Sequence, residues 1–218
     1  MTAKAGIKAS RKRTPNAERT AKTRAKLIEA TIACLYELGF HQTTTTVVAE
    51  RAGVSRGAML HHFPTKADLV MAAAERMRDM RGELHRDRMA ELNTPSEKFL
   101  SLIDVLWEAM TSPSGVARIE LMLSTRSDPE MAQKFSQMND ELDRSHKDSV
   151  WRLCETMGLS GDEDREKVDA FVQLYAAALR GLAIDALREN SREGADSSVE
   201  LLKTFQLQFF QELTANKN

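Results

Sequence analysis

Apolar residues recur along most of this chain at spacings of three to four, which is the period of an amphipathic α-helix. No segment alternates apolar and polar residues for long enough to predict a strand, and we find no internal repeat. The pattern therefore predicts an all-α protein with about nine helices. The expected helices are one between Asn16 and Gly39, two short ones within 44–62, and then 67–92, 97–110, 115–125, 129–157, 165–190 and 196–214.

Several helix ends are marked by residues that satisfy free backbone groups. Gly39 follows the first apolar run, where a glycine commonly terminates a helix. Thr65 is the expected N-cap of the next long helix, and Asp68 interacts favourably with the N-terminus of that helix. Asp128 followed by Pro129 is a further start signal. The helix 67–92 would span roughly 38 Å, so it is long enough to bridge two domains.

Residues 44–66 predict two short helices joined by a tight turn. Gly53 lies at the turn, where a glycine can adopt the positive φ that such a turn often demands. Thr44 is the expected N-cap of the first helix, and Ser55 is that of the second. A helix pair of this size fits the major groove of DNA. The exposed face of the second helix would carry Arg56, Gly57, His61 and His62, with Lys66 just beyond.

The charge distribution supports a face that binds a polyanion at the N-terminal end. The formal net charge is only −1. Residues 1–66 nevertheless hold 12 Lys/Arg against 4 Asp/Glu, a net +8, and residues 67–218 hold 19 against 28, a net −9. Residues 1–15 lack apolar periodicity and are expected to form a disordered basic arm, but the asymmetry survives their removal. We expect a DNA-binding domain over 16–66 and a regulatory domain over 67–218.

Composition narrows the remaining classes. The chain is 42% hydrophobic and 29% charged, which is ordinary for a soluble globular protein. No apolar run approaches the ~20 residues that cross a bilayer, and no apolar segment of a secretory signal follows the basic N-terminus. Cys34 and Cys154 lie within apolar helical patterns, as buried structural thiols do. We expect a cytoplasmic protein with no membrane partner.

The sequence offers little support for a metal site or for catalysis. His61 and His62 are adjacent, so their side chains diverge by about 100° on a helix and cannot easily share one ion. We find no paired Glu-x-x-His motif, no nucleophile with a matching base and no glycine-rich phosphate loop. The prediction is a protein without a metal, a cofactor or an enzymatic activity.

The segment from Gly39 to Leu69 resembles the TetR family of bacterial transcriptional regulators. The matching positions are Gly39-Phe40, Val48-Ala49, Ala52-Gly53-Val54-Ser55, Gly57, His62-Phe63, Lys66 and Leu69. The resemblance covers roughly residues 17–70 and is more specific than a general helix-turn-helix pattern. It implies an N-terminal DNA-binding domain joined to a divergent helical domain. That second domain would dimerise through its last two helices and bind a small ligand in a cavity.

The resemblance also implies roles for single residues. Thr44 and Thr46 would face a DNA phosphate or a base edge, and Lys66 would hold a phosphate. Most relatives have a phosphate-contacting tyrosine at the position of Leu60, so this contact is lost here and His61 or His62 would replace it. The expected DNA contacts are Thr44, Thr46, Ser55, Arg56, Gly57, Ala58, His61, His62 and Lys66.

Physical arguments support these roles to different degrees. Arg56 is suited to a bidentate contact with guanine, worth about 1–3 kcal/mol of discrimination, although an arginine that faces only solvent is the alternative. Lys66 near a helix N-terminus is unfavourable for the helix dipole, and a phosphate bound there would remove that cost. The basic arm would either enter a minor groove or remain solvated.

The regulatory domain is less clearly specified. Its last two helices are apolar over more of their circumference than one core face requires, which predicts a dimer through a four-helix bundle. The alternative is a monomer that buries those faces in its own core. The expected interface residues are Tyr175, Leu179, Leu182, Leu202, Phe205 and Phe209. The expected cavity residues are Trp107, Met110, Arg118, Met122, Arg126, Phe171 and Tyr175, for which ordinary core packing is the alternative.

Arg118 and Arg126 are candidates for anchoring an anionic group, unless they pair with Glu120 and Asp128. The effector would be mainly apolar. The leading hypothesis is a dimeric transcriptional repressor that binds a palindromic operator in double-stranded DNA and responds to a small-molecule effector. The alternatives are a DNA-binding protein without an effector, an enzyme on a helical bundle, and a helical interaction module, which would not explain the charge asymmetry.

Overall fold

The structure is a computed structural model that describes residues 15–124 and 129–215. Within these ranges every regular element is a helix, so the predicted all-α class is confirmed. The helices are α1 (Pro15–Gln42), α2 (Thr45–Ala52), α3 (Arg56–His62), α4 (Lys66–Ala90), α5 (Pro95–Leu100), α6 (Leu102–Thr111), α7 (Pro113–Ser124), α8 (Pro129–Glu155), α9 (Asp162–Asp185) and α10 (Arg192–Ala215).

The predicted helix 97–110 is divided in the structure. Ser101 separates α5 from α6, and its φ of −85° and ψ of −8° remain close to helical values. When α5 and α6 are taken as one interrupted helix, the described residues contain the nine helices that the periodicity predicts. The interruption has no proline or glycine behind it, so the apolar pattern carries no sign of it.

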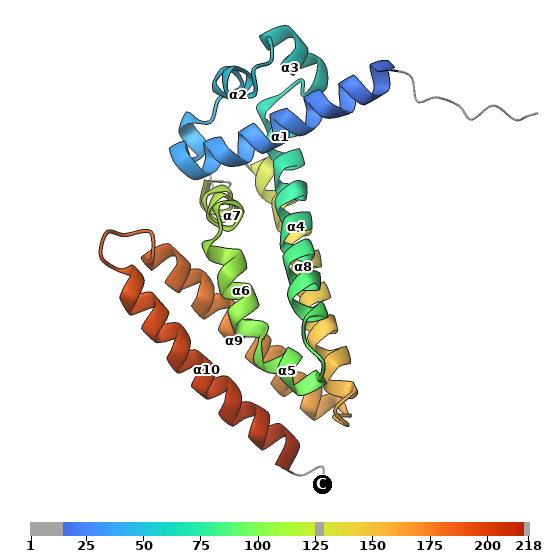
Figure 1. The fold of residues 1–218 in the computed structure, drawn as a ribbon, viewed down its shortest axis with the longest axis vertical. Coiled ribbons are helices and arrows are strands. Elements are labelled where there is room, and N and C mark those ends of the chain that lie inside the picture. Colours follow the sequence, from blue (N-terminus) through green and yellow to red (C-terminus); the bar gives the residue numbers. More distant parts are fainter. Residues whose placement is uncertain (1–14, 125–128, 216–218) are drawn as a thin grey trace, which may run out of the picture.

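The short helices α2 and α3 lie at one end of an elongated molecule, above α1 (Figure 1). Helix α4 leaves that end and runs beside α8 along the length of the molecule, with α6 and α7 facing it. Helices α9 and α10 pack together farther from α2 and α3, and α10 forms an outer edge. The long α4 therefore connects the predicted DNA-binding end to the remaining helices.

Two hydrophobic clusters hold the helices together. The first contains buried residues of α1 to α4, including Leu27, Met59 and Leu69, and it also takes in Leu121 of α7 and Phe135 of α8. The second cluster joins α5, α6, α8, α9 and α10 around Phe99, Tyr175 and other buried side chains. The first cluster crosses the domain boundary expected after residue 66, because α7 and α8 complete the core of the N-terminal helices.

The predicted caps at Thr44, Ser55 and Thr65 are confirmed, and Asp128 falls outside the described residues. Thr44 accepts a hydrogen bond from the Val47 N–H at 3.2 Å, and Ser55 accepts one from the Ala58 N–H at the same distance. Thr65 and Asp68 form a reciprocal capping box at the start of α4. Each cap satisfies a backbone N–H that would otherwise lack a partner at a helix N-terminus. Local sequence therefore fixes where α2, α3 and α4 begin.

Candidate DNA interface and ligand cavity

The turn between α2 and α3 has the conformation that its glycine predicts. Gly53 has φ 64° and ψ 38°, in the left-handed region that L-residues with a side chain rarely adopt. Its N–H donates to the Glu50 carbonyl at 3.1 Å, and the Val54 N–H donates to the Ala49 carbonyl at 2.9 Å. These bonds close α2, and Ser55 starts α3 two residues later.

Buried side chains fix the orientation of α3 on the rest of the N-terminal helices. Met59 is fully buried, and Phe63 at the end of α3 is 3% exposed. Across the turn, Val48 and Ala49 of α2 are buried in the same cluster. One side of α3 is therefore anchored in the core, and the other side is exposed to solvent.

The side of α3 away from the core carries most of the residues expected to contact DNA. Arg56, Gly57 and His61 are exposed, and Ala58 and His62 are half-buried. Thr44, Thr46 and Ser55 are also exposed at the starts of α2 and α3. Leu60 is 41% exposed between these polar residues, so an apolar side chain stands where the family resemblance implies a tyrosine. No Cβ contact would hinder a side chain at Gly57, whose backbone is open to approach.

Two cations in this region already have partners within the protein. Arg51 of α2 forms a two-pronged ion pair with Glu37 of α1, with N–O distances of 2.5 and 2.6 Å. The Lys66 ammonium donates to the Phe40 carbonyl at 2.7 Å and lies 4.0 Å from the centre of the Phe40 ring. Burial lowers the pKa of Lys66. The structure thus gives Lys66 an internal bond, and its contact with a phosphate stays a prediction.

The end of α1 is connected directly to α7. Gly39 interrupts the α1 geometry with φ 75° and ψ 172°, which frees the Phe40 N–H from the helix. That N–H donates to the Glu120 carboxylate of α7 at 2.9 Å. A side chain at Gly39 would meet the same carboxylate oxygen at 3.0 Å. The backbone of Phe40 therefore donates to Glu120 of α7 and accepts from Lys66 of α4. These two bonds connect α1, α4 and α7 at one residue.

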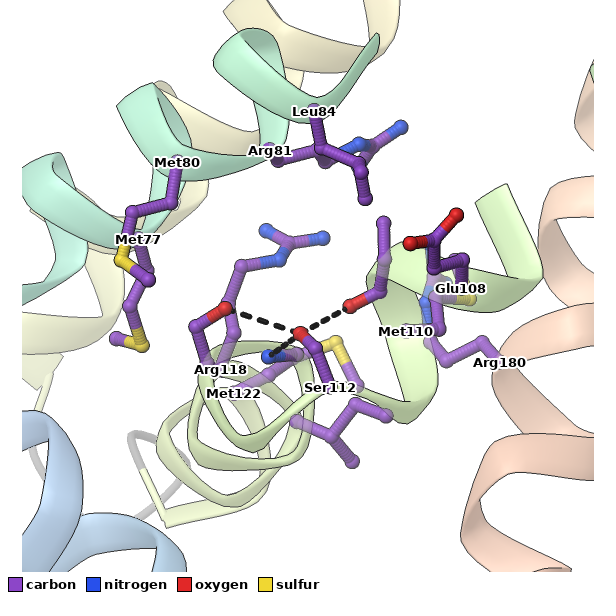
Figure 2. Close-up of a pocket in the computed structure, with 14 residues that line it drawn as sticks. Met77, Met80, Arg81, Leu84, Glu108, Met110, Ser112, Arg118, Met122 and Arg180 are labelled. Carbon is purple, nitrogen blue, oxygen red and sulfur yellow. Dashed lines mark hydrogen bonds between the residues drawn. The ribbon is translucent and has the colours of Figure 1, made fainter. Parts of the chain in front are cut away.

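The other side of α7 borders a cavity of about 230 Å³ between α4, α6 and α9 (Figure 2). Its walls are mainly apolar, and methionines contribute much of the surface. The lining residues are Met77, Met80, Arg81, Leu84, Glu108, Ala109, Met110, Ser112, Ser114, Gly115, Arg118, Ile119, Met122 and Arg180. Met110, Arg118 and Met122 were expected there from the sequence.

Three residues expected at the ligand cavity do not line this one. Trp107 donates from its indole nitrogen to Asp196 of α10 at 3.1 Å, so it faces away from the cavity. Phe171 stacks on Phe209 with ring centres 4.4 Å apart. Tyr175 is fully buried in the second hydrophobic cluster. Each of these residues lies on the apolar face of its helix, and the periodicity alone did not indicate which other helix that face would pack against. Arg126 falls outside the described residues.

A smaller chamber of about 130 Å³ shares Arg81 and Ala109 with the main cavity. His85 and His146 line it, with their rings 6.3 Å apart. His146 Nε2 lies 2.7 Å from the Tyr175 hydroxyl. Burial, aided by the charges of Arg81 and His85, lowers the pKa of His146 to about 3, and burial likewise lowers the pKa of His85. Both imidazoles are therefore neutral at pH 7.

The arginines that line the main cavity were only partly found from the sequence. Arg118 was predicted, and it donates to the Asn139 side chain rather than pairing with Glu120. Arg81 and Arg180 were missed. Arg81 follows Met77 by four residues and precedes Leu84 by three, so it interrupts an apolar stripe. A charged residue at a position where the helix pattern requires an apolar one was the signal that could have identified Arg81 as a cavity residue.

Helices α9 and α10 leave an apolar surface exposed, and only some of its residues are those expected. Phe205 is 51% exposed, and Leu182 and Leu202 are half-buried beside it. Tyr175 and Leu179 have no exposed surface, so they cannot contact a second copy and their assignment to an interface is wrong. Phe209 is half-buried against Phe171. The prediction missed Leu174 and Leu201, which are 62% and 55% exposed.

These α9 and α10 side chains border a shallow groove of about 350 Å³. It is lined by Ala178, Gly181, Leu182, Ser198, Leu201, Leu202 and Phe205. In the parts of the chain that the structure describes, no group of three or more His, Cys, Asp or Glu side chains is arranged to hold a metal ion. Among those same residues, no helix is sufficiently long and apolar to cross a bilayer.

Comparison with known proteins defines the class to which these features belong. The family model "Bacterial regulatory proteins, tetR family" matches residues 27–73, which include α2, α3 and the start of α4. The HTH-type transcriptional regulator CymR of Pseudomonas putida is 30% identical over 185 residues, covering 84% of this chain and 89% of CymR. The chain is thus a helix-turn-helix DNA-binding transcriptional regulator rather than an enzyme. It belongs to the TetR family.

Two further similarities extend over most of the chain. The HTH-type transcriptional repressor AcnR of Corynebacterium efficiens is 27% identical over 190 residues, covering 84% of this chain and 91% of AcnR. A transcriptional regulator from Saccharomonospora viridis, solved in complex with choline, aligns with a TM-score of 0.65 and 16% identity. That alignment covers 88% of this chain and 96% of the solved one, and at this identity it supports the fold alone.

Proposed function

We propose that this regulator is a dimeric repressor that a small, mainly apolar effector releases from a palindromic operator. The observation that carries the proposal is the double role of α7. One side of this helix lines the cavity through Arg118 and Met122, and Glu120 on the same helix bonds the Phe40 N–H of α1. A ligand that moves α7 would therefore act on the helices that hold α2 and α3.

The cavity favours a ligand-responsive protein over a DNA-binding protein without an effector. Well-packed interiors contain few voids larger than a water molecule, so an opening of about 230 Å³ beside a functional connection is unusual. Met77, Met80, Met110 and Met122 provide flexible apolar walls that adapt to a ligand. The choline complex of the Saccharomonospora viridis protein is consistent with effector binding on this fold.

The proposed dimer forms through α9 and α10. Leu174, Leu201 and Phe205 are each more than half exposed, and Gly181 provides a flat site between them. Covering such a surface with its two-fold copy removes the apolar side chains from water and yields a four-helix bundle. A two-fold dimer presents two α3 helices, and it therefore matches an operator with two inverted half-sites.

In the proposed complex, α3 enters the major groove of each half-site. Arg56 reads a base edge, and Gly57 and Ala58 allow the backbone to come close. Thr44, Thr46, Ser55, His61 and His62 contact phosphates around the groove, and Lys66 holds one at the start of α4. The net charge of +8 over residues 1–66 attracts the DNA. The protein acts in the cytoplasm, where it can reach the chromosome.

The oligomeric state tests the dimer directly. Sedimentation at micromolar protein should give about twice the chain mass of 24.4 kDa. Phe205→Asp places a charge in the proposed interface and should yield monomers that bind operator DNA weakly. Leu123→Asp changes a side chain of α7 that is 48% exposed and does not line the α9–α10 groove, and this variant should remain dimeric. A wild-type chain that sediments at 24.4 kDa would contradict the proposal.

DNA binding is tested with a duplex selected by the protein from random sequence. Fluorescence anisotropy should report tight binding that weakens steeply as salt rises, because bound phosphates release counterions. The selected sequence should contain inverted half-sites with centres about one helical turn, or a multiple of it, apart. Binding that ignores salt, or a selected site without inverted symmetry, would contradict this part of the proposal.

A further inference from the structure

Three arginines from three different helices line the main cavity. Arg81 comes from α4, Arg118 from α7 and Arg180 from α9. In Figure 2 the Arg118 side chain projects from α7 into the space that faces α4, with Met77 and Met80 to one side. An apolar cavity with several guanidinium groups at its border favours a ligand that has both an apolar body and a group able to accept their hydrogen bonds.

The charges of these arginines are poorly neutralised by the protein. Arg118 donates to the uncharged Asn139 side chain. Among residues 15–124 and 129–215, neither Arg81 nor Arg180 forms an ion pair, and the carboxylate that borders a neighbouring small cavity with both of them is that of Asp143. Glu108 borders the main cavity, but Arg88 already holds both of its oxygens, at 2.7 and 2.9 Å. Asp143 attracts Arg81 and Arg118 from an exposed position on α8.

Burial makes this arrangement costly for the unliganded protein. Loss of solvation lowers the pKa of the Arg81 guanidinium, and the charge of Arg180 adds to the effect. Burial together with the charges of Arg81 and Arg180 lowers the pKa of Arg118 to about 10. Both groups remain protonated at neutral pH, so like charges are held together in a poorly solvated place. A bound anion would offset that cost.

We propose that the cavity binds a small hydrophobic monocarboxylic acid, with its carboxylate between Arg81 and Arg118 and Arg180 adding further positive charge. The proposal rests on the proposed function in that it takes this cavity as the effector site. A guanidinium presents paired N–H donors that match the two oxygens of a carboxylate. The body of the acid would lie among Met77, Met80 and Met122, in the apolar part of the cavity.

The volume limits the size of that body. An apolar cavity of about 150 Å³ is sufficient for benzene in another protein. A cavity of about 230 Å³ therefore has room for one substituted ring or for an aliphatic group of similar bulk. A polyanion such as an organic phosphate fits less well, because the methionine walls offer it no donors. Ser112 already donates to the Ala109 carbonyl at 2.7 Å, which leaves the arginines as the main source of free donors.

The test compares each acid with its uncharged amide on the full chain without DNA. The probes are phenylacetate, 4-methylbenzoate and octanoate, with binding measured by calorimetry and by thermal shift. We expect at least one acid to bind about 10- to 100-fold more tightly than its amide, since the charged bonds form only with the acid. If no acid binds more tightly than its amide, the proposal is overturned.

Three variants locate the effect. Arg81→Gln should weaken acid binding at least about tenfold and leave amide binding unchanged. Because this variant also removes a repelling charge and breaks no hydrogen bond to any described residue, its unliganded form should melt at or above the wild-type temperature. Arg118→Gln should weaken acid binding similarly. Arg86→Gln removes a charge from the exposed side of α4 and serves as the control. Equal acid affinity in wild type and Arg81→Gln would overturn the proposal.

Failure of this inference can be distinguished from failure of the proposed function. If the protein binds its operator as a dimer but prefers no acid over its amide, the regulator stands and the carboxylate site is wrong. If an acid binds through Arg81 and leaves operator affinity unchanged, the site stands and release by the effector is wrong. Both measurements use the same protein preparation and differ only in the presence of DNA.

Discussion

The DNA-binding end and the cavity of this protein hold their polar groups in opposite ways. In α2 and α3, short-range hydrogen bonds at Thr44, Gly53 and Ser55 set the backbone, and the polar side chains are left exposed to meet a partner. At the cavity, Arg81 and Arg118 come from distant parts of the chain and are withdrawn from solvent. The first region thus has its backbone set before any partner arrives, whereas the second holds like charges in a poorly solvated place, a cost that the proposed ligand would offset.

The largest expected effect is on the free energy of unfolding, when a glycine in each region is replaced by alanine. A Cβ at Gly115, beside the cavity, would lie 2.1 Å from the Ala109 carbonyl oxygen and 2.6 Å from that of Met110. Gly115→Ala should therefore lower the free energy of unfolding by about 3 kcal/mol. In α3, Gly57→Ala meets nothing within 4 Å and should raise stability by about 0.5–1 kcal/mol while impairing DNA binding. Urea unfolding measures the free energy of unfolding of both variants. Equal values for Gly115→Ala and Gly57→Ala would contradict the close packing around Gly115.

Arg56→Ala tests whether the exposed face of α3 reads sequence. The variant should lose about 1–3 kcal/mol of preference for the selected operator over random DNA, because a bidentate base contact is removed. Arg51→Ala is the matched control, since Arg51 is held by Glu37 and should not contact a base. Competition binding at fixed salt measures the preference. Unchanged preference in Arg56→Ala would remove Arg56 from the proposed contacts.

His146, which lines the smaller chamber, should make the stability of the protein depend on pH. This imidazole accepts a proton near pH 3 in the folded protein and near its usual value of about 6.5 when unfolded. Below pH 6.5 the unfolded chain therefore binds more protons, and stability falls as pH falls. Between pH 7.5 and pH 5, proton uptake by His146 in the unfolded chain should lower the free energy of unfolding by about 2 kcal/mol.

His85, Arg81 and Tyr175 surround His146 and remain in the matched variant His146→Gln. Urea unfolding at both pH values should give a smaller loss of stability in this variant than in the wild type. The same loss in both proteins would show that His146 is not held neutral in the folded state.

Glu120 links the two regions, so its removal should affect both. Glu120→Ala breaks the bond from the Phe40 N–H and should lower the free energy of unfolding by about 1.5 kcal/mol, at the low end for a charged acceptor because the site is half-buried. Operator affinity should also change, whereas Glu75→Ala on the exposed side of α4 should alter neither property. If stability falls and operator binding stays the same, Glu120 is structural only.

The smallest expected effect concerns Leu60, which is 41% exposed among the polar residues of α3. Leu60→Tyr supplies the hydroxyl that most relatives are expected to have at this position. It should strengthen binding to all DNA sequences by about 1 kcal/mol, the value of one additional hydrogen bond. Anisotropy with operator and with random duplexes measures this gain. A gain restricted to the operator would mean that position 60 reads bases.

The sequence predicted the DNA-binding end well because its signals are local. Thr44, Ser55 and Thr65 cap helices within three residues of themselves, and Gly53 carries the turn by its own conformational freedom. Such features depend on near neighbours in the chain, and a single sequence contains all of them. The exposed face of α3 follows once the buried positions are known.

The cavity and the proposed interface were predicted less well because they depend on contacts between distant helices. Helix α9 is apolar on several sides, and its periodicity did not show that Tyr175 and Leu179 face inward while Leu174 faces outward. The bond between Glu120 and Phe40 joins residues 80 positions apart. Arg81 was overlooked because a charged residue on a long helix usually faces solvent.

The most direct test of the central claim is reciprocal binding of an acid and the operator. Operator affinity is measured by anisotropy with and without a saturating acid from the carboxylate panel, and acid affinity is measured with and without operator. Each ligand should lower affinity for the other by the same factor, in the range of about 5- to 150-fold. An acid that binds in the cavity and leaves operator affinity unchanged would contradict the central claim.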